Sequence, residues 1–450
     1  PDPAHAGLSQ PHSRKEVAQG IISRGSRISG KALNFVFLVI LRPNPDTSTG
    51  GNLVKRIVQF TMVFALVFGA GSALAFHDGG VAYCAGCHTM HNSIDGDVWS
   101  AYPGYTNPMP GNPKLLVQPG ATDTCLRCHA SYGQMHDGSG YGAGGDFYWV
   151  TKEFSWTPPW PGAQTTYSYA DNHGHNVISP TYGIIADGTL TTAPGGTFES
   201  DKLVCTSCHD PHGQDTFRLL YSNSGLTDPL APDGPIYVVP GQPGDTRFTF
   251  VEAAPIAFGQ GRKTTVDADP ETDDLHTIYK SGMSDWCANC HTQIHSENTG
   301  NYVHKTDEAM NGLAGNYNSY VSSTNLDGGS QATAYNALVP FEDIDADLSD
   351  PNDDLGAGAT HDYNAGPTGQ DKVMCLTCHR AHATAFDDAT RWDMHADLLV
   401  DSHPKLGDTG ATADDVLNSY YGRDWATIDI NQRSLCNKCH VKDWGDHAPY

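Results

Sequence analysis

The 450-residue chain is acidic, with 51 Asp and Glu against 26 Lys and Arg and a formal net charge of −25 at pH 7. Nucleic acids and anionic membrane surfaces attract positive patches, so this charge excludes nucleic acid as a partner. The chain also contains 48 glycines and 28 prolines. Because these residues interrupt regular structure, turns and loops should outnumber long helices and strands.

A secretory signal is the first element along the chain that the sequence predicts. Lys55 and Arg56 precede an apolar run over residues 57–74, which ends in an Ala-Leu-Ala pattern. A positively charged start, an apolar middle and a small-residue end are typical of a cleaved signal peptide. We therefore predict a signal peptide over residues 53–75, a mature chain that begins at Phe76, and secretion through the periplasm.

The residues on the two sides of this signal differ in character. Residues 1–52 are polar and basic, and their apolar stretch, residues 32–41, is too short to cross a membrane. We interpret residues 1–52 as an over-extended start that is not part of the product. Residues 76–450 contain no evident linker and are expected to form one unit, with 18 Lys and Arg against 48 Asp and Glu, a formal net charge of −30.

All twelve cysteines fall into six copies of the pattern Cys-x-x-Cys-His, numbered here motifs 1 to 6 in chain order. This pattern attaches a c-type haem, with both thiols forming thioethers and the histidine becoming the proximal iron ligand. The cysteine pairs are Cys84 and Cys87, Cys125 and Cys128, Cys205 and Cys208, Cys287 and Cys290, Cys375 and Cys378, and Cys436 and Cys439. The proximal histidines are His88, His129, His209, His291, His379 and His440. The pattern predicts six haem c groups as cofactors.

Two other uses of cysteine are alternatives for these motifs. Secreted chains often pair an even number of cysteines in disulfides. Structural zinc sites combine two Cys-x-x-Cys knuckles into one tetrahedral site. Neither use explains why a histidine follows every second cysteine, so covalent haem attachment is the favoured interpretation.

The predicted fold class is a multihaem cytochrome c, mostly loops and turns with few short helices and minimal strand, wrapped round a chain of stacked haems. Six haems leave roughly sixty residues for each, near the lower limit for a domain that builds its own core. Short strands in small hairpins are predicted over residues 234–239 and 246–251. Helices are predicted over residues 390–399 and 412–421, the latter ended by Gly422.

Each haem iron also needs a second, distal axial ligand or an open position, and this choice separates electron transfer from catalysis. Some histidines follow a motif so closely that they cannot reach the far face of their own haem but can cap a neighbouring one. These are His91, His212, His295 and His382. His175 and His361 precede motifs 3 and 5, in loops long enough to return over the haem. The six together are the favoured distal ligands, and His77, His136 and His304 are reserves.

The supply of histidines favours electron transfer over catalysis. Met90 and Met135 could replace a histidine, but the histidines already outnumber the irons. No motif has the Cys-x-x-Cys-Lys form that marks the catalytic haem of multihaem nitrite reductases. We therefore predict an electron-transfer protein rather than an enzyme. A monomeric periplasmic or surface shuttle, and a multihaem reductase with one open haem, are the alternatives.

Seven segments of the mature chain resemble the OmcS family, the outer-surface hexahaem cytochromes of metal-reducing bacteria that polymerise into conductive filaments. The segments are FHDGGVAYCAGCHTMHNS (76–93), GGDFYWV (144–150), TLTTAPGGT (189–197), CTSCHDPHG (205–213), GMSDWCANCHTQIH (282–295), CLTCHRAHA (375–383) and LCNKCHVKD (435–443). They occur in this order and include five of the six motifs. The loop after motif 2, residues 131–145, and the tail, residues 444–450, depart from the family pattern.

This resemblance implies that all six irons have two histidine ligands and that the haems form a continuous chain in each subunit. It further implies that His91 of one copy ligates the haem on Cys375 and Cys378 of the next copy. Such a contact is heterologous and does not close on itself, and therefore builds a filament. The expected function is extracellular electron transfer at the cell surface, with redox donors and acceptors such as metal oxides as partners.

Overall fold

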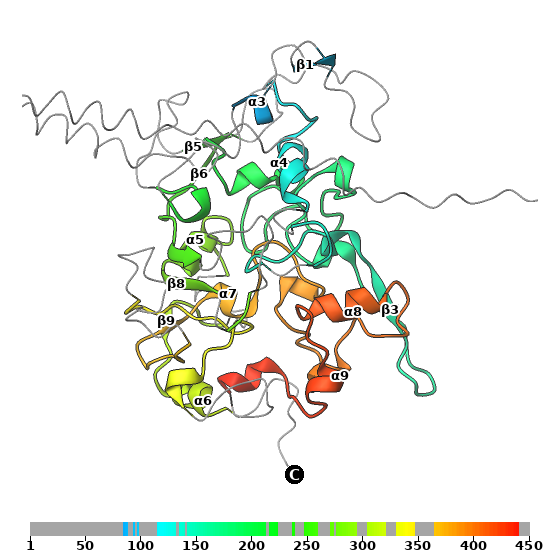
Figure 1. Ribbon diagram of the computed structural model, residues 1–450, viewed down its shortest axis with the longest axis vertical. Coiled ribbons are helices and arrows are strands. Elements are labelled where there is room, and N and C mark those ends of the chain that lie inside the picture. The colour runs from blue at the N-terminus through cyan, green and yellow to red at the C-terminus, as the bar shows by residue number, and fades with distance from the viewer. Residues whose placement is uncertain are drawn as a thin grey trace, which may run out of the picture. The chain divides into compact units, whose positions relative to one another are not determined.

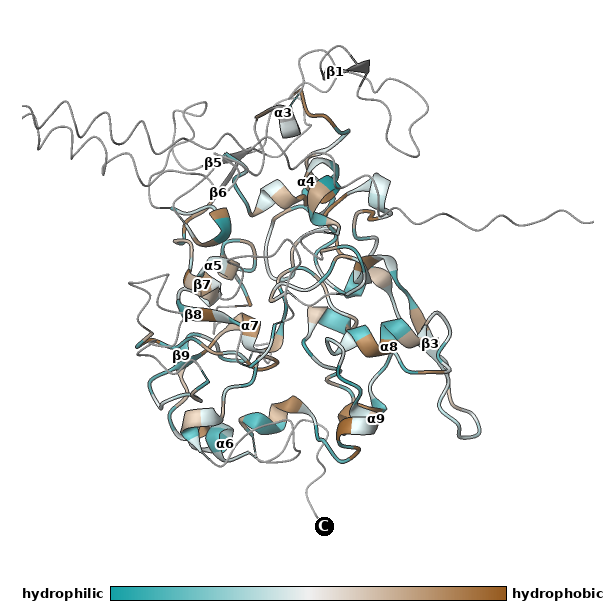
Figure 2. Cartoon of the chain, viewed as in Figure 1, coloured by the Kyte–Doolittle hydropathy of each residue, from teal (hydrophilic) through white to brown (hydrophobic). Residues whose placement is uncertain are grey.

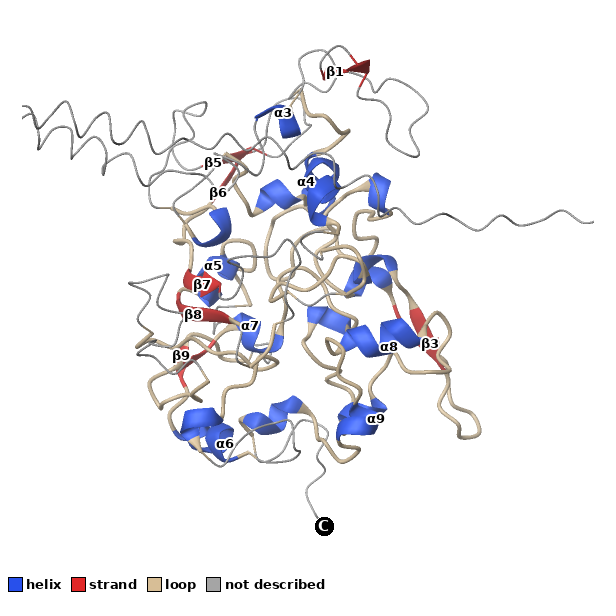
Figure 3. Cartoon of the chain, in the orientation of Figure 1, coloured by secondary structure: helices blue, strands red, loops and turns tan. Residues whose placement is uncertain are grey.

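Short elements joined by loops make up the part of the chain that the computed structural model describes (Figure 3). The described residues are 84–88, 93–94, 97–98, 115–131, 135–139, 142–212, 216–223, 236–238, 247–259, 271–273, 276–294, 304–320, 330–346 and 364–440. All of them belong to the compact unit Ala73–Tyr450. The predicted signal peptide and residues 1–52 lie outside the described residues.

The helices are short, and most are associated with the attachment motifs (Figure 1). The α-helices are α3 (Cys84–Cys87), α4 (Ala121–His129), α5 (Met283–Ala288), α6 (Gly312–Ser319), α7 (Cys375–Cys378), α8 (Ala413–Ser419) and α9 (Trp425–Ile428). Single 3-10 turns include η6 (Cys205–Ser207), η7 (Phe217–Leu219), η11 (Asp387–Ala389), η12 (Leu399–Asp401) and η13 (Leu435–Lys438). None of the described helices is long and apolar enough to cross a membrane.

Of the two predicted helices, the one over residues 412–421 is confirmed as α8. Thr412 caps its start, because the Thr412 hydroxyl accepts a hydrogen bond from the backbone N–H of Asp415 at 3.1 Å. The Asp415 carboxylate in turn accepts one from the backbone N–H of Thr412 at 2.9 Å, which completes a capping box. Gly422 follows the helix with φ +76°, a conformation that suits glycine.

The other prediction, a helix over residues 390–399, is wrong. Thr390 forms a β-bridge with His379, and Leu398 forms one with Arg433. The backbone N–H of Arg391 donates to the Cys378 carbonyl at 2.7 Å. Backbone groups bonded to distant segments cannot also form a helical ladder, so this segment is irregular until η12 begins at Leu399.

The described strands form small antiparallel pairs, and most of these pairs are hairpins, as predicted. They are β1 (Ser93–Ile94) with β2 (Asp97–Val98), β3 (Phe154–Trp156) with β4 (Thr166–Ser168), β5 (Ile236–Val238) with β6 (Arg247–Thr249), β7 (Ile256–Gly259) with β8 (Thr277–Ser281), and β9 (Glu308–Ala309) with β10 (Lys372–Val373). The β5–β6 hairpin confirms the strands predicted over residues 234–239 and 246–251. Glu342 bridges both Tyr279 and Lys372, which joins the β7–β8 and β9–β10 pairs.

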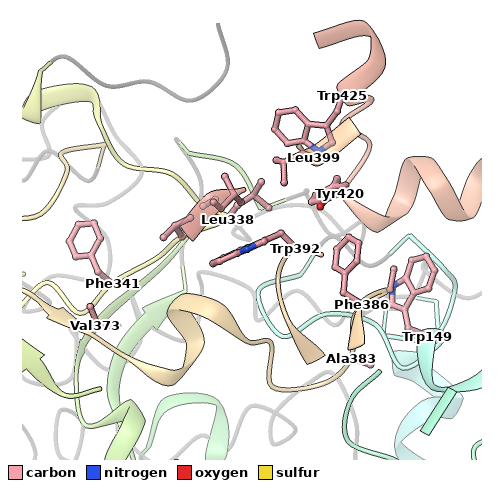
Figure 4. Packing of buried hydrophobic residues seen from close by; sticks show 14 of the residues in the cluster. Trp149, Leu338, Phe341, Val373, Ala383, Phe386, Trp392, Leu399, Tyr420 and Trp425 are labelled. Carbon is pink, nitrogen blue, oxygen red and sulfur yellow. The ribbon is translucent and has the colours of Figure 1, made fainter. Parts of the chain in front are cut away.

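A hydrophobic cluster of buried residues joins residues 126–184 to residues 310–435 (Figure 4). Trp392 and Leu338 are each 1% exposed, and Trp149, Phe386 and Trp425 pack in the same cluster. Apolar residues elsewhere are dispersed among polar ones along the short elements (Figure 2). The chain therefore builds more core of its own than the small number of residues for each haem led us to expect.

Candidate haem-attachment sites

The six attachment motifs lie beside one another in chain order. In Figure 1, α3, α4, α5 and α7 follow one another from top to bottom. Thiols of successive motifs interact, through the pairs Cys87 and Cys128, Cys125 and Cys205, Cys208 and Cys290, Cys287 and Cys375, and Cys378 and Cys436. In the first four pairs, second cysteines pair with second cysteines and first cysteines with first cysteines, in alternation along the chain. Groups attached to these cysteines would therefore follow one another in the order of the motifs.

Motifs 2 and 3 pack together in the same way as motifs 4 and 5. The backbone N–H of Cys205 donates to the Thr122 hydroxyl at 3.3 Å, and the backbone N–H of Cys375 donates to the Ser284 hydroxyl at 3.1 Å. Each hydroxyl stands three residues before the first cysteine of the even-numbered motif. The chain therefore repeats a unit of two motifs.

Motifs 1, 3 and 5 share a further feature, a hairpin that follows the proximal histidine. The proximal histidine forms a β-bridge with a residue of the returning strand: His88 with Leu116, His209 with Leu220, and His379 with Thr390. The next residue donates its backbone N–H to the carbonyl of the second cysteine: Val117 to Cys87, Tyr221 to Cys208, and Arg391 to Cys378. The same backbone frame therefore holds the proximal histidine in all three odd-numbered motifs.

The hairpins of motifs 3 and 5 also fix the tautomer of the proximal histidine. His209 donates from Nδ1 to the Arg218 carbonyl at 2.8 Å, and His379 donates from Nδ1 to the Asp388 carbonyl at 2.8 Å. Both carbonyls belong to residues with positive φ, 50° and 58°, so local backbone strain aims them at the imidazole. Since Nδ1 carries the hydrogen, Nε2 presents a lone pair to a metal.

Among the described residues, four pairs of histidine rings face each other across a gap of nearly constant width. Two imidazoles bound through nitrogen to opposite sides of one metal, at about 2 Å each, have ring centroids roughly 6 Å apart. The observed centroid distances are 6.1 Å for His88 and His212, 6.5 Å for His209 and His382, 6.1 Å for His291 and His175, and 6.0 Å for His440 and His304. The first of each pair is a predicted proximal ligand, so these pairs fit the axial positions of haems on motifs 1, 3, 4 and 6.

The second members of these pairs also have a fixed tautomer in three cases. His175 donates from Nδ1 to the Ala381 carbonyl at 2.6 Å, His382 to the Gly145 carbonyl at 3.3 Å, and His304 to the Lys305 carbonyl at 3.0 Å. Their Nε2 atoms therefore remain free for a metal. Within the described ranges, no group of three or more His, Cys, Asp and Glu side chains could hold a metal. A paired arrangement suits a haem, whose porphyrin supplies the other four nitrogens.

Imidazoles in these pairs have lowered pKa values and so favour the neutral form that a metal requires. The pKa of His382 is lowered to about 3, first by burial and then by the nearby His209. Burial likewise lowers the pKa of His291 to about 4, with a smaller effect from His175. The pKa of His440 is also lowered, first by burial and then by His304.

The structure places some predicted ligands differently from the sequence argument. His212 and His382 face neighbouring motifs, as expected of histidines that closely follow a motif. His175 was expected to return over motif 3 but faces His291 of motif 4. His304, one of the three reserves, faces His440.

The other predicted ligands are not found in such pairs. His136 has its Nε2 enclosed by protein atoms, and its ring packs edge-on against Tyr182 at 5.3 Å. His91, His295, His361 and His77 lie outside the described residues, and their roles stay predictions.

The state of the cysteines agrees with haem attachment. None of the twelve is in a disulfide, although all of them lie within the described part of the chain. Burial raises the pKa of the Cys290 and Cys378 thiols to about 12. The thiols differ in this respect, because hydrogen bonds, first that with Cys287, lower the pKa of Cys375 to about 6. The case against disulfides and zinc therefore rests on geometry, since the cysteines form no disulfide and no group of three or more His, Cys, Asp and Glu side chains in the described ranges could hold a metal.

Comparison with known proteins confirms the resemblance and the fold class predicted from the sequence. No protein-family model matches the chain. The C-type cytochrome OmcS of Geobacter sulfurreducens is 36% identical over 436 residues, which cover 84% of this chain and 97% of that protein. Two solved structures, described as OmcS nanowires and as an Outer Membrane Cytochrome S filament of the same organism, each superpose with a TM-score of 0.59 and 32% identity, covering 82% of this chain and all of theirs. The chain belongs to the OmcS family of c-type cytochromes.

Proposed function

We propose that this protein carries electrons outside the cell through six haem c groups, one on each motif, and that copies of it join into a filament. The bound irons would supply reversible one-electron oxidation and reduction. The chain's own residues attach the groups, orient them and fill both axial positions. The observation that carries the proposal is the chain-order adjacency of the six motifs together with the facing histidine pairs.

A repeating rule for the odd-numbered motifs supports polymerisation. His212 of motif 3 faces His88 of motif 1, and His382 of motif 5 faces His209 of motif 3. Each facing histidine stands seven residues after the first cysteine of its own motif, and His91 has the same position in motif 1. Within one copy, no odd-numbered motif precedes motif 1.

In a filament, the odd-numbered motif before motif 1 is motif 5 of the adjoining copy. The rule therefore assigns His91 of one copy to a haem of the adjoining copy. That haem is the one attached to Cys375 and Cys378, and His91 would bind its iron on the side opposite His379. Because this contact is heterologous and leaves a free site at each end, repetition produces a filament. The relatives solved as filaments support the same assembly.

A second rule concerns the even-numbered motifs. His175 lies before motif 3 and faces His291 of motif 4, and His304 lies before motif 5 and faces His440 of motif 6. The segment before motif 1 contains His77. We therefore assign His77 to motif 2, opposite His129. His295 and His361, which the sequence argument preferred, become the alternatives.

Charge indicates the kind of partner that exchanges electrons with this protein. Residues 76–450 contain 18 Lys and Arg against 48 Asp and Glu. A strongly negative surface attracts cations and basic proteins and repels anionic surfaces. Oxidised metals, metal oxides and basic redox proteins are therefore the proposed donors and acceptors, at the cell surface or beyond it.

The test is His91→Ala, with His395→Ala as the control because the His395 side chain is exposed and faces no motif in the described chain. Both variants should be secreted with a full set of haems. His395→Ala should form filaments by electron microscopy, and His91→Ala should give discrete particles in which one haem per chain binds carbon monoxide. Filaments from His91→Ala would contradict the shared ligand. Discrete particles from the unaltered protein would favour a monomeric shuttle, and carbon monoxide binding by it would favour a reductase.

A further inference from the structure

We propose that Gly144, Gly145 and Gly174 position two distal histidines, His382 and His175, and that a displacement of one of these histidines also displaces the other. The inference rests on the proposed function, because it takes these histidines as the sixth ligands at motifs 3 and 4. It gives a physical role to the segment GGDFYWV, which the sequence pattern marks but the attachment motifs do not explain.

Three short backbone segments, residues 144–146, 174–175 and 381–383, are bonded to one another around His382, and we call them the clamp. Gly145 forms a parallel bridge with Ala383, and Gly174 forms an antiparallel bridge with the same residue, so Ala383 lies between them. The backbone N–H of His382 donates to the Gly144 carbonyl at 2.7 Å, and that of Asp146 donates to the Ala383 carbonyl at 3.0 Å. Backbone hydrogen bonds on both sides therefore fix the position of the His382 backbone and the direction of its side chain.

The same clamp holds His175. Its backbone N–H donates to the His382 carbonyl at 2.8 Å, and its ring Nδ1 donates to the Ala381 carbonyl at 2.6 Å. The His382 ring donates from Nδ1 to the Gly145 carbonyl at 3.3 Å and stacks on Phe147 with centroids 4.6 Å apart. A shift of residues 381–382 must therefore move both histidines together.

Space, rather than backbone conformation alone, requires glycine at these positions. A Cβ atom on Gly144 would lie 2.8 Å from Nδ1 and 2.9 Å from Cε1 of His382. On Gly145 it would lie 2.0 Å from the Ala383 carbonyl oxygen, and on Gly174 2.3 Å from the His382 carbonyl oxygen. Only Gly145 also has a positive φ, +84°. Any side chain in the clamp must therefore push His382 or its backbone aside.

The surroundings of the clamp leave little room for such a shift. Asp146 is fully buried, and its carboxylate accepts backbone hydrogen bonds from Gly138 at 2.9 Å and Tyr148 at 2.8 Å. Figure 4 shows Ala383 beside Trp149 and Phe386 in the hydrophobic cluster. Because the backbone is held on both sides, the His382 imidazole must move most, and the backbone of residues 381–382 moves less.

The required movement exceeds what an axial bond tolerates. To reach ordinary van der Waals contact, the His382 ring must retreat from a Gly144 Cβ by roughly 0.6 Å, whereas metal–ligand distances vary by only about 0.2 Å. A methyl group at residue 144 should therefore break or stretch the bond from His382, and the shared carbonyls should transmit part of the displacement to His175.

The test is Gly144→Ala with Gly142→Ala as the matched control, since a Cβ on Gly142 meets nothing within 4 Å and its φ is not positive. The purified proteins are reduced and titrated with carbon monoxide, and the oxidised proteins are examined by low-temperature electron paramagnetic resonance. His382→Ala and His175→Ala provide the reference spectra for motifs 3 and 4. Gly144→Ala should bind about one carbon monoxide per chain, lose the signal missing in His382→Ala, and shift the signal missing in His175→Ala. Gly142→Ala should match the unaltered protein.

The possible contrary results are distinct. A Gly144→Ala protein with unchanged spectra and no carbon monoxide binding would overturn the positioning role, and a change confined to motif 3 would overturn the coupling. If Gly144→Ala does not mature, Phe147→Leu replaces it, and an unshifted His382 signal in that variant would also overturn the role. Carbon monoxide binding by the unaltered protein, or no effect of His382→Ala, would instead contradict the proposed function.

Discussion

Replacing His304 is the most discriminating single perturbation of the proposed ligand set. Its ring lies 6.0 Å from that of His440, and its Nδ1 donates to the Lys305 carbonyl at 3.0 Å, which leaves Nε2 toward His440 as the free nitrogen. His304→Ala removes one of twelve proposed axial ligands. The reduced variant should therefore bind about one carbon monoxide per chain, with roughly a sixth of the haem absorbance shifting, since a six-coordinate iron has no site for the gas.

His136→Ala is the matched comparison, because the sequence offered His136 and His304 as equal reserves. The Nε2 of His136 is enclosed by protein, and burial lowers its pKa, as expected of a neutral packing residue. This variant should bind no carbon monoxide and should lose only the contact with Tyr182. The reasoning is refuted if His136→Ala opens a haem or if His304→Ala does not.

Further expectations concern haem number and stability. The pyridine haemochrome assay should give six haems per chain, and five after Cys436 and Cys439 are both changed to Ala; any other count contradicts the motif assignment. Leu338→Ala should lower the free energy of unfolding by about 2–5 kcal/mol in a denaturant titration, because Leu338 is 1% exposed in the cluster. Asp415→Asn should cost about 1–3 kcal/mol, since the carboxylate accepts hydrogen bonds from Tyr148 and the capping backbone. Burial raises the pKa of Asp415, but the hydrogen bonds to its carboxylate outweigh burial, and the pKa in the folded protein is lowered. The ionised carboxylate therefore stabilises the fold above the ordinary carboxyl pKa, and this stabilisation is lost as pH falls through the lowered pKa of Asp415. The stability of the Asn variant should not show this dependence on acid pH.

Local patterns in the sequence were sufficient to predict the attachment sites and the character of the fold. A Cys-x-x-Cys-His motif specifies its chemistry within five residues, so no tertiary information was needed. Helix α8 was predictable because its cap at Thr412 and its stop at Gly422 are also local. The segment over residues 390–399 has similar composition, but its backbone bonds reach Cys378 and Arg433, and no local pattern reports such partners.

The distal histidines show where sequence reasoning was insufficient. His212 and His382 were found because each closely follows a motif. His304 precedes its facing partner His440 by more than a hundred residues, and only the packing of motif 6 brings the two rings together. The two-motif repeat could have indicated it, since His175, like His304, lies before an odd-numbered motif. That repeat is evident in the structure, from hydrogen bonds such as those to Thr122 and Ser284, but it is hardly visible in the amino-acid sequence.

Cryo-electron microscopy of material sheared from the cell surface tests the central claim most directly. The account predicts filaments in which six haems per subunit follow the order of the motifs. His91 of one copy should be bonded to the iron opposite His379 in the adjoining copy, and His77 should lie opposite His129. Filaments with a different ligand at that joint, or discrete particles in which all six irons are completed within one chain, would contradict it.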